Sequence, residues 1–138
     1  MPAKDVFHYQ ARHALEKDGW VITHDQFFIQ SGGVEIYIDL GAEHLIAAQK
    51  ERQKIAIEVK SFVAPSIISE FHTAVGQYID YRSVLEDEEP DRKIYLAVPS
   101  DIYESFFQLP FAQRVMTRNQ IYVMVFDVTQ EVIVQWHD

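Results

Sequence analysis

The chain has 138 residues, of which 48% are hydrophobic and 24% are charged, as is typical of a soluble globular protein. This length predicts one domain over residues 1–138 with a sizeable buried core. Cysteine is absent, which excludes disulfides, thiolate metal sites and cysteine nucleophiles. No apolar run reaches membrane-spanning length and the first residues do not resemble a signal peptide, so we expect a cytoplasmic protein without membrane contacts.

The net charge is −9, from 12 lysines and arginines against 21 aspartates and glutamates. Part of the excess lies in residues 86–91, which read EDEEPD. Nucleic-acid-binding proteins are usually basic. Contact with DNA would therefore need a local basic patch, a metal ion that reverses the local field, or a partner protein.

The first half of the chain predicts a helix followed by strands. Residues 5–18 are predicted to form an amphipathic helix ending at Gly19, and residues 20–24 a short strand. Residues 27–40 have the pattern of a hairpin with SGG as its turn. Residues 45–49 fit a strand or one helical turn equally well. The side chains expected on the apolar face of the helix are Val6, Tyr9 or Gln10, His13 and Ala14, and those expected on one face of the second hairpin arm are Ile36, Ile38 and Leu40.

The second half alternates strands and helices. Residues 54–62 predict a strand, 66–88 a long helix capped by Ser66, and 92–99 a buried strand. Two short helices separated at Pro110 are expected over 100–119, then a strand over 121–128 and an edge strand over 131–136. A strand–helix–strand step of this length implies parallel pairing. The order predicts an α/β fold with a mixed sheet and helices on its faces. Its long helix is expected to bury Ile68, Phe71, Val75 and Ile79.

A candidate active site lies in the strand KIAIEVKSF. Glu58 and Lys60 share its polar face, and Asp39 precedes Glu58 by 19 positions, a spacing at which a hairpin return would bring the two carboxylates together. Such a pair favours a divalent cation such as Mg²⁺ or Mn²⁺. The Val59 carbonyl would be a further ligand, and Lys60 would orient or deprotonate an attacking water. This arrangement predicts phosphodiester hydrolysis. The alternative is a weak surface salt bridge.

Other side chains are weaker candidates. Gln77 and Tyr81 lie four positions apart on one helical face, where Gln77 would hold a water or phosphate and Tyr81 would support it; a polar glutamine and a core tyrosine explain them as well. A third carboxylate would come from Glu16 or Glu43, although solvated surface acids explain both equally. The candidates for DNA contact, alternatively a solvated hairpin tip, are Lys50, Arg52 and Lys54.

With these residues, the chain resembles the PD-(D/E)xK nuclease superfamily, whose restriction-endonuclease-like fold has an αβββαβ core. Asp39 and the run Glu58-Val59-Lys60 match its motif, although Ile38 stands where many members have proline. The pair Gln77 and Tyr81 is similar to the Q-x-x-x-Y element of the RecB-like branch. Nearly the whole chain resembles the XisH family, named after a controlling factor for excision of the fdxN element in cyanobacterial heterocyst differentiation. The stretches that carry this second resemblance are ALEKDGWVITHD, YIDLGAEHLIAAQK, KIAIEVKSF, GQYIDYR, YLAVPSDIYESFF and IVQW.

The resemblance implies Asp39 and Glu58 as metal ligands, Lys60 as the water-activating residue and Gln77 as a supporting group. It also implies participation in programmed DNA excision, with DNA and the companion excision factor XisI as expected partners. Self-association into a homo-oligomer is a separate expectation. Nuclease folds are reused for other purposes. A non-catalytic regulatory or scaffold protein, which binds an excision factor or recombinase, is therefore the alternative function.

Overall fold

The computed structural model describes residues 3–46 and 51–138. Its helices are α1 (His8–Lys17), α2 (Ile67–Glu88), α3 (Ser100–Glu104) and α4 (Pro110–Arg118), with a 3-10 turn η1 (Phe106–Gln108). Its strands are β1 (Val21–His24), β2 (Phe27–Ser31), β3 (Val34–Ile38), β4 (Leu40–Ile46), β5 (Glu51–Val59), β6 (Arg92–Pro99), β7 (Val123–Asp127) and β8 (Val132–His137). Within the described residues, no helix is long and apolar enough to cross a membrane.

The predicted α/β class and mixed sheet are confirmed. Six strands form one sheet in the order β1-β4-β5-β6-β7-β8. Strands β1, β4 and β5 pair antiparallel, β5, β6 and β7 pair parallel, and β8 returns antiparallel along β7. The parallel pairs are those connected through α2 and through the α3–α4 segment, as crossover connections require. Strands β2 and β3 form a separate hairpin.

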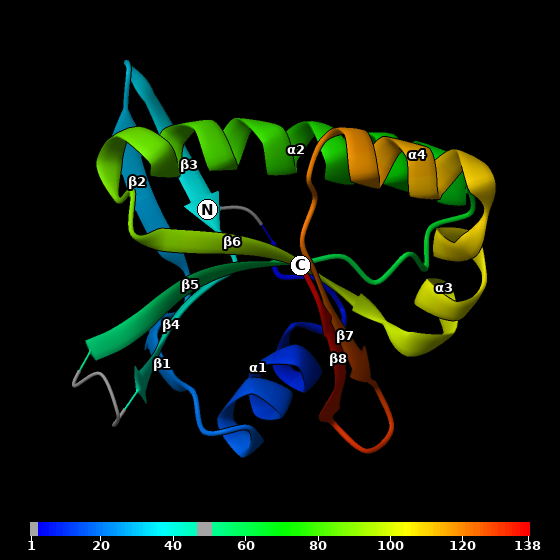
Figure 1. Cartoon of the computed structure of the whole chain (residues 1–138), viewed down its shortest axis with the longest axis horizontal. Helices are drawn as coiled ribbons and strands as arrows, with labels where there is room; N and C mark the ends of the chain where they lie inside the picture. Colours follow the sequence, from blue (N-terminus) through cyan, green and yellow to red (C-terminus); the bar gives the residue numbers. More distant parts are fainter. Residues whose placement is uncertain (1–2, 47–50) are drawn as a thin grey trace.

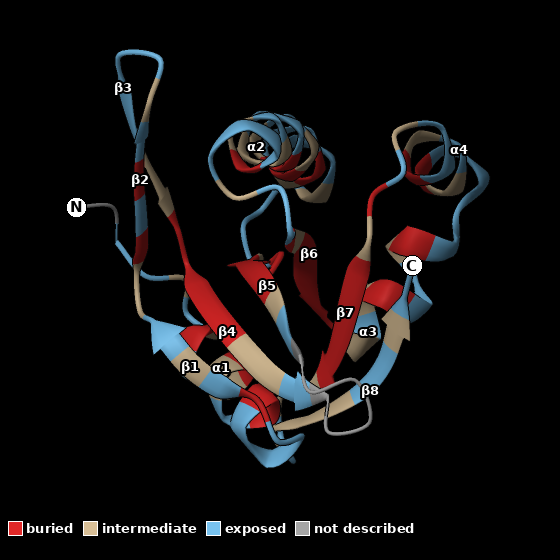
Figure 2. Ribbon diagram, turned by 60° about the vertical axis from the view of Figure 1, so that its left-hand side comes forward, coloured by how far each residue is buried: buried red, intermediate tan, exposed pale blue. Residues whose placement is uncertain are grey.

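The sheet lies between two layers of helices. Helices α2 and α4 cover one face and α1 covers the other (Figure 1). Each face has its own apolar core: Phe71 and Phe107 belong to the cluster on the α2 side, and Leu15 and Ile57 to the cluster on the α1 side. The hairpin β2–β3 projects from the sheet beside α2 with its tip exposed (Figure 2). Tyr37 of β3 and Gln77 and Tyr81 of α2 line a common cavity.

Local chemistry explains where several elements begin and turn. The Ser66 hydroxyl accepts a hydrogen bond from the Ser69 N–H at 3.2 Å, as predicted for the N-cap of α2. Pro110 is the first residue of α4, a position that needs no N–H donor. The hairpin turns at Gly32 and Gly33, whose φ angles of 57° and 87° favour glycine.

The strand β4 differs from its prediction. Leu45 and Ile46 belong to this strand, so the strand, and not the helical turn, is correct for these two residues. Residues 47–49 lie outside the described residues. The expectation that Ile38 and Leu40 share a face is wrong, because Ile38 packs in the cluster on the α2 side and Leu40 in the cluster on the α1 side. The chain bends at Asp39, between β3 and β4, and this bend interrupts the two-residue alternation.

The predicted buried faces of both long helices need correction. Helix α1 buries His8, Ala11, Ala14 and Leu15; of the residues expected there, only Ala14 is buried. Helix α2 buries Phe71, Ala74, Tyr78 and Leu85, whereas Ile68 and Ile79 are exposed. Tyr78 is accommodated in the core because its hydroxyl donates to the Ile94 carbonyl and accepts from the Tyr122 N–H, so its polar atom is paired.

Candidate active site

Two carboxylates meet where β3 gives way to β4, beside the end of β5. Asp39 and Glu58 are only 9% and 5% exposed. The Val59 N–H donates to Asp39 Oδ2 at 2.7 Å, and the Asp39 N–H donates to Glu58 Oε1 at 3.3 Å. Each chain segment thus holds the carboxylate of the other. The pairing of β4 with β5, in which Leu40 lies opposite Ile57, produces the proximity that the spacing predicted.

Burial and mutual repulsion make the charged form of this pair unfavourable. Burial, followed by the negative charge of Asp39, raises the pKa of Glu58 to about 8. Burial also raises the pKa of Asp39, against the effect of its hydrogen bond from Val59. Lys60 Nζ lies 3.7 Å from Glu58 Oε2, and its positive charge acts against both increases. One lysine therefore does not compensate fully for two buried carboxylates.

A cavity of about 230 Å³ opens over the pair. Its lining comes from the N-terminal segment, β3, the bend after it, the end of β5 and α2, and comprises Ala3, Asp5, Tyr37, Asp39, Glu58, Val59, Lys60, Gln77 and Tyr81. Helix α2 therefore brings Gln77 and Tyr81 to the carboxylates. The Oε1 atom of Gln77 is buried without a hydrogen-bond partner. Burial, followed by the charges of Glu58 and Asp39, raises the pKa of Tyr81 to about 12, so this hydroxyl stays protonated at neutral pH.

Asp5 is a cavity residue that the sequence did not suggest. Its Oδ1 accepts from the Phe7 N–H at 2.9 Å and its Oδ2 from the Ser61 N–H at 3.0 Å. The first bond resembles helix capping, for which an aspartate just before a helix is a sequence signal. The second bond joins positions 56 residues apart, and no local pattern indicates it. Asp5 thus ties the N-terminal segment to the chain immediately after Lys60.

His8 is a second residue that sequence reasoning missed. It is completely buried at the start of α1, and its Nε2 lies 2.8 Å from Asp25 Oδ1. Arg12 donates to the other oxygen of Asp25 at 2.7 Å. The Nδ1 atom of His8 is buried without a partner. Burial raises the pKa of Asp39, and the nearby His8 ring acts to lower it. His8 therefore belongs to the electrostatic surroundings of the carboxylate pair.

The other acidic candidates do not reach the cavity. Glu16 lies on the exposed side of α1, where its carboxylate is 3.7 Å from Arg12 Nε. Glu43 lies on β4, opposite Lys54 of β5. Neither lines the cavity, so the expectation that one of them supplies a third carboxylate is not met. The third acid that lines the cavity, beside Asp39 and Glu58, is Asp5.

Arg52 and Lys54, two of the predicted DNA-contact residues, are distant from the carboxylates. Lys54 lies four residues before Glu58 on β5, roughly 13 Å away along an extended strand, and its Nζ is 3.5 Å from Asp91 Oδ2. Arg52 is exposed still further along this strand. Arg52 and Lys54 are thus at the opposite end of β5 from Lys60. Lys50 lies outside the described residues.

The residues present fit a hard divalent cation in part. Over the described ranges, no group of three or more histidine, cysteine, aspartate or glutamate side chains has the arrangement of a metal site. The donors at hand are the carboxylates of Asp39 and Glu58 and the Val59 carbonyl, with the unpaired Oε1 of Gln77 nearby. Oxygen donors of this kind suit Mg²⁺ or Mn²⁺, and a cation would relieve the repulsion between the two carboxylates.

Comparison with known proteins identifies the family. The model of the XisH protein family matches residues 1–134. This chain belongs to the XisH family. A crystal structure of an XisH family protein from Nostoc punctiforme PCC 73102 is 49% identical, covering 97% of this chain and 100% of that one, with a TM-score of 0.89. The crystal structure of an fdxN element excision controlling factor protein from Anabaena variabilis is 51% identical over 98% and 100% of the two chains, also with a TM-score of 0.89. No curated protein matches the chain.

Proposed function

We propose that this XisH family protein is a Mg²⁺-dependent (or Mn²⁺-dependent) nuclease-fold protein that hydrolyses DNA phosphodiesters during excision of a programmed DNA element. The observation that carries the proposal is the buried pair of Asp39 and Glu58, with Lys60 beside it, in a cavity of about 230 Å³. The relative from Anabaena variabilis, whose name is that of an fdxN element excision controlling factor, supports the excision role.

The arrangement of strands and helices supports the nuclease part of the proposal. The PD-(D/E)xK superfamily places its acidic residues and lysine on adjacent strands of an αβββαβ core. Here Asp39 directly precedes β4, Glu58 lies at the end of β5, and Lys60 is the first residue after that strand, with α2 the next element. Fold alone does not establish an activity, and for this reason the proposal depends on the contacts in the cavity.

In this proposal, Asp39, Glu58 and the Val59 carbonyl hold the cation. When bound, it would stabilise negative charge on a phosphate oxygen and lower the pKa of a water molecule. Lys60 Nζ lies next to Glu58 Oε2; as an ammonium it orients the attacking water, and as the neutral amine it takes a proton from that water. Gln77 positions that water or a phosphate oxygen. Tyr81, whose hydroxyl stays protonated, supports Gln77 in the lining of the cavity.

A non-catalytic role is the second candidate, because the net charge of −9 opposes DNA binding in the absence of a cation. In that case the chain is a regulatory or scaffold protein that binds the companion excision factor XisI or a recombinase, alone or as a homo-oligomer. A scaffold has no need for a divalent-ion site, so metal binding discriminates between the two functions.

The test is calorimetric titration of Mg²⁺ and Mn²⁺ into the wild type and Asp39→Asn, with Glu43→Gln as the matched control outside the cavity. Binding should vanish in Asp39→Asn and persist in the control. Incubation with plasmid and branched DNA follows, in which Glu58→Gln and Lys60→Ala should lose metal-dependent nicking while remaining folded. If the wild type binds no metal and nicks no DNA even with XisI present, the scaffold function replaces the nuclease.

A further inference from the structure

Helix α4 has an unusual charge pattern for so acidic a chain. Residues 105–126 contain no aspartate or glutamate, and Arg114 and Arg118 are their only charged side chains. The two arginines are four positions apart, and both are exposed. They therefore lie on the same side of α4, where their like charges repel each other and weaken the helix slightly. An anionic ligand on this side would remove that cost.

These arginines also differ from most of the other cations in having no partner. Within the described residues, neither Arg114 nor Arg118 takes part in a hydrogen bond, ion pair or cation–π contact. The lysines and arginines that have an acidic or carbonyl partner are Lys4, Arg12, Lys17, Lys54, Lys60, Arg82, Arg92 and Lys93. Arg52, on β5, is the other described cation for which no such contact is found. The positive charge of α4 is thus available to an external group.

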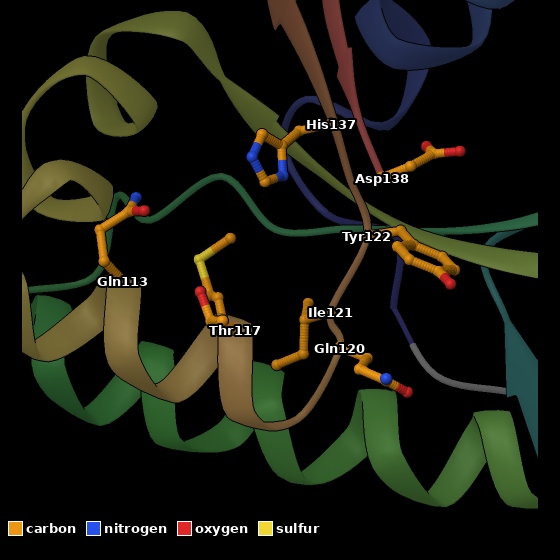
Figure 3. Close-up of a pocket in the computed structure, with 8 residues that line it drawn as sticks. Gln113, Thr117, Gln120, Ile121, Tyr122, His137 and Asp138 are labelled. Carbon is orange, nitrogen blue, oxygen red and sulfur yellow. The ribbon is translucent and has the colours of Figure 1, made fainter.

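Two adjoining hollows lie along this part of the surface. One, of about 260 Å³, is lined by Gln113, Arg114, Thr117 and Arg118. The other, of about 370 Å³, shares Gln113 and Thr117 and extends to His137 at the end of β8 (Figure 3). Its floor includes the apolar side chains of Met116 and Ile121. The hollows thus combine two guanidinium groups with an amide and a hydroxyl.

One carboxylate also lines the larger hollow and has to be considered. Asp138 accepts from Lys93 Nζ at 2.6 Å and from the Tyr95 hydroxyl at 2.8 Å. Its negative charge is therefore paired. The smaller hollow has no acidic lining residue. An anion at Arg114 and Arg118 consequently meets no unpaired carboxylate among the residues that line this hollow.

We infer that the face of α4 formed by Gln113, Arg114, Thr117 and Arg118 is a docking surface for the phosphodiester backbone of DNA. Arginine guanidinium groups bind phosphate oxygens through charge-assisted hydrogen bonds, and glutamine and threonine side chains commonly add phosphate contacts. Such contacts position a duplex or single strand without reading its sequence. The inference rests on the proposed function, and it assigns DNA contact to α4 in place of the far end of β5.

The test measures DNA binding in EDTA, where neither a metal ion nor cleavage contributes. Fluorescence anisotropy of a labelled duplex and its single strand compares the wild type with Arg114→Glu, Arg118→Glu and the milder Arg114→Gln. The matched control is Arg52→Glu, which changes the net charge equally at another unpaired arginine. Each α4 charge reversal should weaken binding by about tenfold or more, as expected for a lost charge-assisted contact. Arg114→Gln should reduce the slope of affinity against salt by about one.

Three results would overturn the inference. The first is wild-type protein that binds neither DNA probe in EDTA. The second is a loss in Arg52→Glu as large as that in Arg114→Glu, because net charge would then explain both. The third is unchanged DNA affinity in Arg114→Glu together with a shift from dimer to monomer in sedimentation, which would assign the face to the acidic residues 86–91 of a second copy.

The nicking assay separates this inference from the proposed function. Loss of EDTA binding in the α4 variants without any wild-type nicking supports the docking surface and refutes catalysis. Nicking by the wild type, with DNA affinity unchanged in the α4 variants, supports catalysis and refutes the docking surface.

Discussion

Replacing Glu58 by glutamine should stabilise the metal-free protein, because it removes a charge from the buried pair. The pKa of this carboxyl rises from 4.5 to about 8 in the folded state, chiefly through burial and then through repulsion by Asp39. The folded state therefore holds the proton more tightly than the unfolded state. Consequently the free energy of unfolding should fall as pH increases from 4.5 to about 8 and remain level above that.

The size of this change in stability follows from the difference between the pKa of Glu58 in the unfolded state and its pKa in the folded state. At about 1.4 kcal/mol for each pH unit, the interval from 4.5 to about 8 corresponds to at most about 5 kcal/mol. Glu58→Gln keeps the shape of the side chain without its charge, so the variant should lack this slope. It should exceed the wild type in stability by a few kcal/mol at the alkaline end and resemble it at the acidic end.

Urea denaturation in EDTA across this pH window measures the prediction. Glu43→Gln, at a half-buried position on β4 outside the cavity, is the control and should follow the wild type. Saturating Mg²⁺ should restore stability to the wild type, by about 2.7 kcal/mol at a concentration of 100 times the dissociation constant, but not to Glu58→Gln. A flat wild-type profile, or a variant no more stable than the wild type above pH 8, would refute the reasoning.

Two further predictions concern the core. Tyr78→Phe should lower the free energy of unfolding by about 1–3 kcal/mol, because the Ile94 carbonyl and the Tyr122 N–H lose their buried partner; urea denaturation tests this, and unchanged stability would contradict it. Gly41→Ala should also destabilise by about 1–3 kcal/mol, since its Cβ would lie 2.8 Å from Phe27 Cδ2 and 2.9 Å from His24 Nδ1. An unchanged melting temperature would show that these neighbours move aside easily.

The sequence predicted the carboxylate pair because strand periodicity and spacing are local signals. Glu58 and Lys60 were placed on one face by the two-residue alternation, and the hairpin distance brought Asp39 beside them. Asp5 and His8 could not be placed in this way. Their contacts with Ser61 and Asp25 connect positions 56 and 17 residues apart, and depend on how α1 and the N-terminal segment pack against the sheet.

The buried face of α2 was predicted correctly at Phe71 and incorrectly at Ile68 and Ile79, for a related reason. The predicted face combines Phe71 with these isoleucines, whereas the buried face combines Phe71 with Ala74, Tyr78 and Leu85. Hydrophobicity alone favours the isoleucines. The structure buries Tyr78 because strand β6 and the chain before β7 supply partners for its hydroxyl, and a partner supplied by tertiary packing is not visible in the sequence of the helix.

The distribution of charge connects the candidate active site with α4. The cavity brings together Asp5, Asp39 and Glu58, and Lys60 is the one lysine or arginine among its described lining residues. The field of the cavity therefore attracts a divalent cation and repels a phosphate until that cation has bound. The face around Arg114 and Arg118 carries positive charge and, in the inference above, would hold DNA without a metal ion. A chain of net charge −9 would thus bind DNA at a site separate from its metal ligands, with cation binding required only for a phosphate to enter the cavity. The DNA-binding measurement in EDTA therefore tests the face of α4, and the calorimetric titration tests the metal ligands in the cavity.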